Sequence, residues 1–169
     1  GSIPTKQLIL PIDSQQVIKT QTVDSANAHR IDSMMVIKLR RGMSKADLMV
    51  LEMINTNKWE RPIYFAVTVG ENYYPAVNEY FQLEGLAYRL VPIKTEENSD
   101  RVNTEVMYDN MMNKFRWGGI EKEGVYLDET VLRMCRTQRL MFCHLIDALL
   151  KEGKEEKARK ALNRCLAVI

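Results

Sequence analysis

The sequence predicts an α/β fold in which a small, largely parallel sheet with flanking helices is followed by a C-terminal helical hairpin. Two stretches support this prediction: residues 44–69 change from a helical pattern to a buried strand, and the last third of the chain is helical. With 169 residues, of which 46% are hydrophobic, the chain can bury a core of its own. We expect an α/β domain over residues 3–120 and the hairpin, packed on it, over residues 121–169.

The centre of the expected sheet is a strand–helix–strand unit. Residues 34–39 (MMVIKL) have the apolar composition of a strand, and Ser44 with Asp47 three positions later predicts a capped helix start. The helix that follows is apolar on more than one side, which predicts that several of its faces are covered. Residues 62–67 (PIYFAV) form an uninterrupted apolar run typical of a strand buried on both faces. Short connections between these elements predict a right-handed βαβ unit with parallel strands.

The other elements follow from local patterns. Residues 6–12 (KQLILPI) predict an edge strand, where the missing donor of Pro11 is tolerated, and residues 86–93 (LAYRLVPI) predict a further strand. Residues 13–33 are polar and weakly periodic, which favours a loop with one short element. Asn103 is a suitable cap for a helix that ends at Gly118.

The hairpin consists of two helices. Asp128 caps the first, which ends at Gly153, and the second carries apolar residues at helical spacing up to Ile169. Leu149, Gly153, Ala158 and Ala161 resemble one tetratricopeptide-type repeat. A single copy is not a solenoid, because about three repeats are needed to bury a continuous core.

Bulk properties narrow the function classes. A net charge of +2 argues against a dedicated nucleic-acid-binding protein, and no apolar run approaches the ~18–20 residues that span a bilayer. Gly1 and Ser2 are typical of a cloning remnant. The three cysteines, Cys135, Cys143 and Cys165, are expected to be small core residues. The sequence contains no Walker loop, no G-x-G-x-x-G and no Asp-x-Asp motif, so we expect no cofactor and no metal.

Two polar segments flank the strand at 62–67. Glu71, Asn72, Tyr73 and Tyr74 follow its carboxyl end, the position at which open α/β sheets usually bind ligands. These side chains either bind a sugar by stacking and hydrogen bonding, or they cover the end of the sheet. Residues 59–61 (Trp-Glu-Arg) form a turn at the opposite end, where the arginine either binds an anion or pairs with a neighbouring carboxylate.

Four long segments of the chain together resemble a known family: DLMVLEMINTNKWERPIYFAVTVGENYY, FQLEGLAYRLVPIK, NTEVMYDNMMNKFRWGG and YLDETVLRM. They resemble the soluble C-terminal region of large, multi-spanning bacterial membrane proteins, first grouped as a domain of unknown function and later linked to protein O-mannosyltransferases of the GT-C type. The resemblance implies a parent protein that uses a lipid-phosphate sugar donor outside the cytoplasm. The catalytic carboxylate of such enzymes belongs to a loop between transmembrane helices, so no catalytic residue is assigned to this chain.

The resemblance leads to an expected function. The chain is expected to be a non-catalytic accessory domain of a membrane glycosyltransferase, on the extracytoplasmic (periplasmic) face of the bacterial inner membrane. It would contribute to acceptor or glycan recognition or to assembly, with the parent transmembrane domain, a glycan or an acceptor protein as partner. The alternatives are a structural or protein-interaction module that docks through the hairpin, and a self-contained enzyme whose site assembles from scattered residues.

Overall fold

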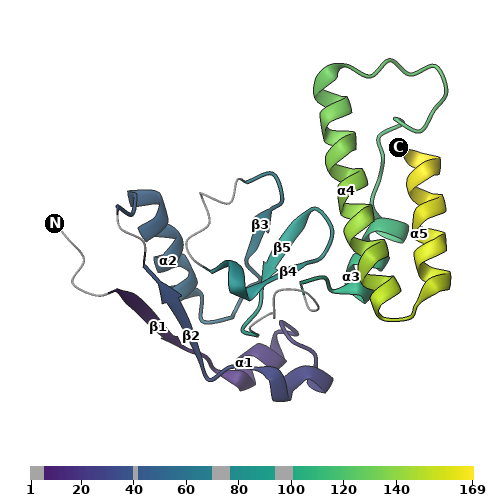
Figure 1. Ribbon diagram of the computed structural model, residues 1–169. Coiled ribbons are helices and arrows are strands. Elements are labelled where there is room, and N and C mark those ends of the chain that lie inside the picture. Colours follow the sequence, from purple (N-terminus) through teal and green to yellow (C-terminus); the bar gives the residue numbers. More distant parts are fainter. Residues whose placement is uncertain (1–5, 40–41, 70–76, 94–100) are drawn as a thin grey trace. The chain divides into compact units, whose positions relative to one another are not determined.

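The computed structural model describes residues 6–39, 42–69, 77–93 and 101–169 (Figure 1). It is a mixed α/β structure with two compact units. The first unit comprises Gly1–Gln82 and Ala87–Asn98, and the second comprises Leu83–Leu86 and Ser99–Ile169. The division into residues 3–120 and 121–169 stays a prediction. Within the described part of the chain, no helix has the length and apolar character required to cross a membrane.

The first unit contains an antiparallel ribbon of β1 (Gln7–Pro11) and β2 (Met34–Lys38). Side chains alternate along both strands, as the period of two in a strand requires. Leu10 lies opposite Met35 on the buried side, whereas Ile9 and Met34 are exposed on the other side. Both strands were predicted from the sequence, and both are confirmed.

A second small sheet has the order β3-β5-β4. The strands are β3 (Tyr64–Ala66), β4 (Phe81–Leu83) and β5 (Ala87–Leu90), and β3 pairs antiparallel with β5. The predicted parallel sheet is therefore wrong, and β2 and β3 belong to different sheets. Tyr64 is 47% exposed, so β3 is not buried on both faces. An apolar run does not report strand direction, because orientation depends on pairing with residues far away in the sequence.

The described helices of the first unit are α1 (Ser14–Lys19), the 3-10 helix η1 (Ser25–Arg30), α2 (Lys45–Asn57) and the 3-10 helix η3 (Asn78–Tyr80). Side chains cap the starts of α1, η1 and α2, whereas η3 begins without a side-chain cap. The capping box of α2 is confirmed: the Ser44 amide donates to the Asp47 carboxylate over 2.8 Å, and the Asp47 amide donates to the Ser44 hydroxyl over 3.2 Å. The prediction that α2 is covered on several faces is wrong, since Met49 and Met53 are 65% and 56% exposed.

The core of the first unit has two parts. The larger part is centred on fully buried Tyr80, whose hydroxyl oxygen accepts a hydrogen bond of 3.1 Å from the Val36 amide. Trp59 and Ile12 pack against both parts. The larger part contains Leu10, Met35, Ile37, Leu51, Ile54, Val77, Tyr80, Phe81 and Leu90, and the smaller contains Val17, Val23, Val91 and Ile93.

The second unit is largely helical. Its elements are α3 (Thr104–Asp109), the π-helix η4 (Asn110–Lys114), α4 (Glu129–Lys151) and α5 (Glu155–Val168). The predicted caps are confirmed: Asn103 accepts from the Val106 amide over 3.1 Å, and Asp128 accepts from the Val131 amide over 2.8 Å. α4 and α5 pack side by side as the expected helical pair (Figure 1).

A charged network joins α3 to α5 and to the connection between α4 and α5. The Thr104 hydroxyl donates to Glu152, while Lys154 and Lys157 donate to Glu105 over 2.7 and 2.8 Å. The hydrogen bond from Lys154, followed by that from Lys157, lowers the pKa of Glu105 to about 2.

The three cysteines of the second unit differ in exposure. Cys135 and Cys165 are buried as expected, and burial raises the pKa of the Cys165 thiol. Cys143 is exposed, so the expectation that it is a core residue is wrong. All three thiols are free.

Candidate functional site

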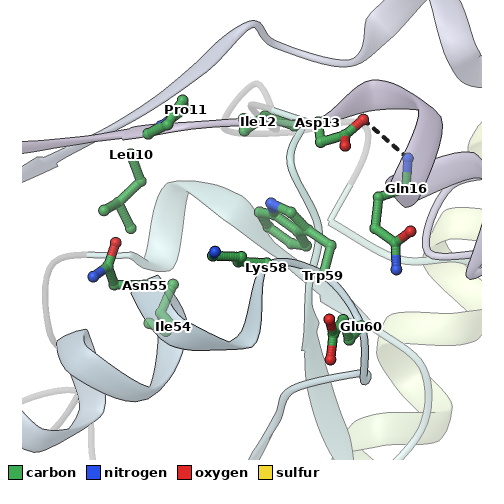
Figure 2. Close-up of a pocket in the computed structure, with 10 residues that line it drawn as sticks. All are labelled: Leu10, Pro11, Ile12, Asp13, Gln16, Ile54, Asn55, Lys58, Trp59 and Glu60. Carbon is green, nitrogen blue, oxygen red and sulfur yellow. Dashed lines mark hydrogen bonds between the residues drawn. The ribbon is translucent and has the colours of Figure 1, made fainter.

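The first unit contains a cavity of about 480 Å³ between the segment that joins β1 to α1 and the C-terminal end of α2 (Figure 2). This volume lies within the ~300–1,000 Å³ range typical of ligand pockets. Five apolar and five polar residues line the cavity: Leu10, Pro11, Ile12, Ile54 and Trp59, and Asp13, Gln16, Asn55, Lys58 and Glu60.

A strained turn forms one wall of the cavity. α2 is capped at its C-terminal end by Lys58, which has φ 43° and ψ 35°, and the next residue, Trp59, has φ 62°. The Glu60 amide donates to the Asn57 carbonyl over 2.9 Å, and the Asn57 side chain donates to the Arg61 carbonyl over 2.7 Å. Positive φ at both central residues is the geometry of a type I′ turn, which Asn and Gly normally occupy.

The unusual residue in this turn is Trp59. A bulky side chain at positive φ is a genuine outlier, and each such residue costs about 1–3 kcal/mol. Among the described non-glycine residues, only Gln21, Lys58 and Trp59 have positive φ, and two of these three line the cavity. The strain is therefore concentrated at this cavity, where it positions the indole ring.

The indole ring has two roles in this position. Trp59 is half-buried, and its contacts with both parts of the core fix the orientation of the indole ring. Its remaining surface belongs to the cavity wall. In Figure 2 the ring lies between Lys58 and Asn55 on one side and Asp13 and Gln16 on the other.

The polar groups retain capacity to bind a ligand. Asp13 caps α1 through Oδ1, which accepts from the Gln15 and Gln16 amides over 3.0 and 3.1 Å, and these bonds leave Oδ2 available. Within the described residues, Lys58 forms an ion pair with neither Asp13 nor Glu60. The two carboxylates and one ammonium give the lining a formal charge of −1.

These groups are suited to recognition. An aromatic face, two carboxylates, two amides and one ammonium can orient a polar ligand of small-molecule size. Over the described ranges, no group of three or more His, Cys, Asp or Glu side chains is arranged to hold a metal ion.

A smaller cavity of about 290 Å³ lies in the second unit, between the start of α4 and the end of α5. Its lining is mainly apolar and includes Cys135, Arg136 and Arg139. Of these two arginines, Arg139 already donates a hydrogen bond to the Ile169 carbonyl. The larger cavity offers the greater variety of binding groups.

The sequence-based site residues have different outcomes. Glu71, Asn72, Tyr73 and Tyr74 lie outside the described residues, so their role stays a prediction. In the turn at residues 59–61, the structure places the tryptophan and the glutamate in the cavity wall, but the arginine is not part of the lining.

Sequence reasoning missed four of the polar residues in the lining: Asp13, Gln16, Asn55 and Lys58. The first two lie in a segment that was interpreted mainly as loop. An aspartate followed by Ser14 at a helix start was the one available local signal.

The described residues thus form a mixed α/β structure with a cavity walled by an indole ring. A family model described as TMEM260-associated domain 2 matches residues 1–106, which include every residue that lines this cavity. The chain therefore belongs to the family of TMEM260-associated domain 2. The family description suggests association with a parent membrane protein. No curated protein and no solved structure matches the chain.

Proposed function

We propose that this chain is a non-catalytic, extracytoplasmic recognition domain of a membrane glycosyltransferase, and that the cavity beside Trp59 binds one sugar residue of a glycan or acceptor. The observation that carries the proposal is an indole ring held at φ 62° in the wall of a cavity of about 480 Å³. The membrane association is supported by the family description, and the glycosyltransferase and periplasmic assignments by the sequence resemblance.

A sugar ring matches the chemistry of this lining. One face of a pyranose carries C–H groups that pack on an aromatic ring, and its rim carries hydroxyl groups that donate and accept hydrogen bonds. Trp59 supplies the apolar face, while Gln16, Asn55 and the two carboxylates supply polar partners around it.

An NMR titration tests the proposal. The probes are the methyl glycosides of mannose, glucose, galactose and N-acetylglucosamine, followed by short oligosaccharides. The chain has two tryptophans, so the indole N–H signal of Trp117, in the second unit, is an internal control for that of Trp59. We expect saturable shifts of the Trp59 signal and of neighbouring amides, with Trp117 unchanged.

Variants make the titration specific. Asn55→Ala and Gln16→Ala should weaken binding without disturbing the core, since Asn55 is exposed and Gln16 is only half-buried. Tyr126→Ala is a matched control, because this aromatic side chain is 88% exposed and lies outside the lining. Silence of Trp59 at millimolar ligand would reject the proposed site. Shifts confined to residues 71–74 would favour the site expected from the sequence instead.

A second candidate function is docking through the helical pair. Leu132, Leu140, Leu150, Leu162 and Leu166 of α4 and α5 are between 45% and 73% exposed, which is unusual for so many leucines on two adjacent helices. A tetratricopeptide-like hairpin would use such a surface to bind the parent protein. Leu166→Glu should then reduce co-purification with a separately expressed parent transmembrane domain and leave the Trp59 titration unchanged. Unaltered co-purification would count against this role.

A further inference from the structure

The charges around the cavity indicate which sugars it accepts. Asp13 and Glu60 bring two carboxylates to the lining, and neither forms an ion pair within the part of the chain that the structure describes. The C-terminal end of α2, from which Ile54 and Asn55 reach the cavity, adds the negative end of a helix dipole. The negative face of the Trp59 indole attracts cations in the same way.

One positive group opposes these four features. Lys58 lies with Asn55 on the side of the indole away from Asp13 and Gln16 (Figure 2). A ligand that carries a positive group at the Asp13 end and neutral hydroxyl groups at the Lys58 end would satisfy both sides. A phosphate or carboxylate on the ligand would be repelled by the two carboxylates of the lining and attracted by only one ammonium group, that of Lys58.

From this charge distribution we infer that the cavity selects an amino sugar, a hexose bearing a protonated amine, over neutral and anionic sugars. This inference rests on the proposed function and names the class of ligand for the same site. The ammonium group binds at the carboxylate of Asp13, Glu60 adds a second negative charge to the lining, and the pyranose ring packs on Trp59. Lys58 and Asn55 bind the hydroxyl groups at the opposite end of the ring.

The test compares sugars that differ at one position. Glucosamine and glucose differ in the amine at C2, N-acetylglucosamine has the same nitrogen without its charge, and glucose 6-phosphate carries negative charge. Binding is measured at pH 6 through the Trp59 indole signal. Glucosamine should bind about tenfold more tightly than glucose, a ratio that corresponds to ~1.4 kcal/mol. The preference should fall with added salt and disappear when the amine is deprotonated at high pH.

Two substitutions separate charge from shape. Glu60→Gln and Asp13→Asn each remove a carboxylate with little change in size, and asparagine is as good an N-cap for α1 as aspartate. Each should reduce several-fold the ratio of glucosamine affinity to glucose affinity, which is the quantity that the lost carboxylate charge controls. Glu52→Gln is the matched control, because Glu52 is an exposed residue of α2 outside the lining.

The outcomes distinguish this inference from the proposed function. If no sugar in either titration shifts the Trp59 signal, the proposed function fails and the inference fails with it; if only methyl mannoside, methyl galactoside or an oligosaccharide does, the inference alone fails. If glucose or N-acetylglucosamine binds as tightly as glucosamine, the cavity binds sugars but does not select the amine. Tighter binding of glucose 6-phosphate would assign recognition to Lys58 and overturn the inference.

Discussion

Replacing Gly85 with alanine tests the packing of the second unit. Gly85 has φ +138°, a backbone conformation that other residues rarely adopt, which costs about 1–3 kcal/mol in an L-residue. An added Cβ would also lie 2.8 Å from Cζ of Phe115, so the ring must move, and such overpacking typically costs ~1 kcal/mol or more. Together these effects predict that Gly85→Ala destabilises the second unit by about 3 kcal/mol.

Urea unfolding of the whole chain measures this effect. Gly118→Ala is the control, since Gly118 also has positive φ, +68°, but a Cβ there meets no atom within 4 Å. That substitution should cost only about 1 kcal/mol. Adding Phe115→Leu to the Gly85→Ala variant should remove the part due to overcrowding and leave the backbone strain. Equal losses for Gly85→Ala and Gly118→Ala, or no coupling between positions 85 and 115, would refute the reasoning.

Two further predictions concern hydrogen bonds within each unit. Tyr80→Phe leaves the Val36 amide without its acceptor, so urea unfolding should show a loss of about 1–2 kcal/mol, and no loss would mean that water replaces the hydroxyl. Glu105 has its pKa lowered to about 2 from 4.5, so the unfolded chain binds more protons than the native chain at acidic pH. The stabilisation by Lys154 and Lys157 is thus fully present above pH 4.5 and lost as the pH falls toward 2. Because Glu105 is 61% exposed, its contribution is about 1 kcal/mol or less. Glu105→Gln should remove this portion of the acid dependence of unfolding, and an unchanged pH profile would show that the network does not stabilise the fold.

Helix starts were predictable from the sequence because a cap is a local interaction. The caps at Ser44, Asn103 and Asp128 each bond an amide three residues later, and all three are present in the structure. Sheet topology was not predictable in the same way. β3 pairs with β5 through Tyr64 and Arg89, and no pattern near either residue specifies that partner.

The cavity was only partly predictable for a related reason. The turn at residues 59–61 was identified as polar and separate from the helix. Its positive φ angles were not predictable, because Lys58 and Trp59 are neither glycine nor asparagine, the residue types that usually indicate positive φ. Asp13 and Trp59 line the same cavity only because the end of β1 and the end of α2 pack around the same core. Such a site depends on the tertiary structure, which single-sequence patterns do not describe.

The division of the chain into two units has a practical consequence for the design of shorter fragments. The chain leaves the first unit after Gln82, returns at Ala87 and leaves again after Asn98, so neither unit is a single continuous segment. A fragment ending at residue 106, where the family match ends, would retain Leu83 and its bridge partner Val102 but lack α4 and α5. A fragment starting at Ser99 would lose Glu84, whose carbonyl accepts a hydrogen bond of 2.7 Å from Asn110. To produce one unit alone, its two segments would have to be joined by a new linker, because truncation at either end of the chain leaves part of the unit behind.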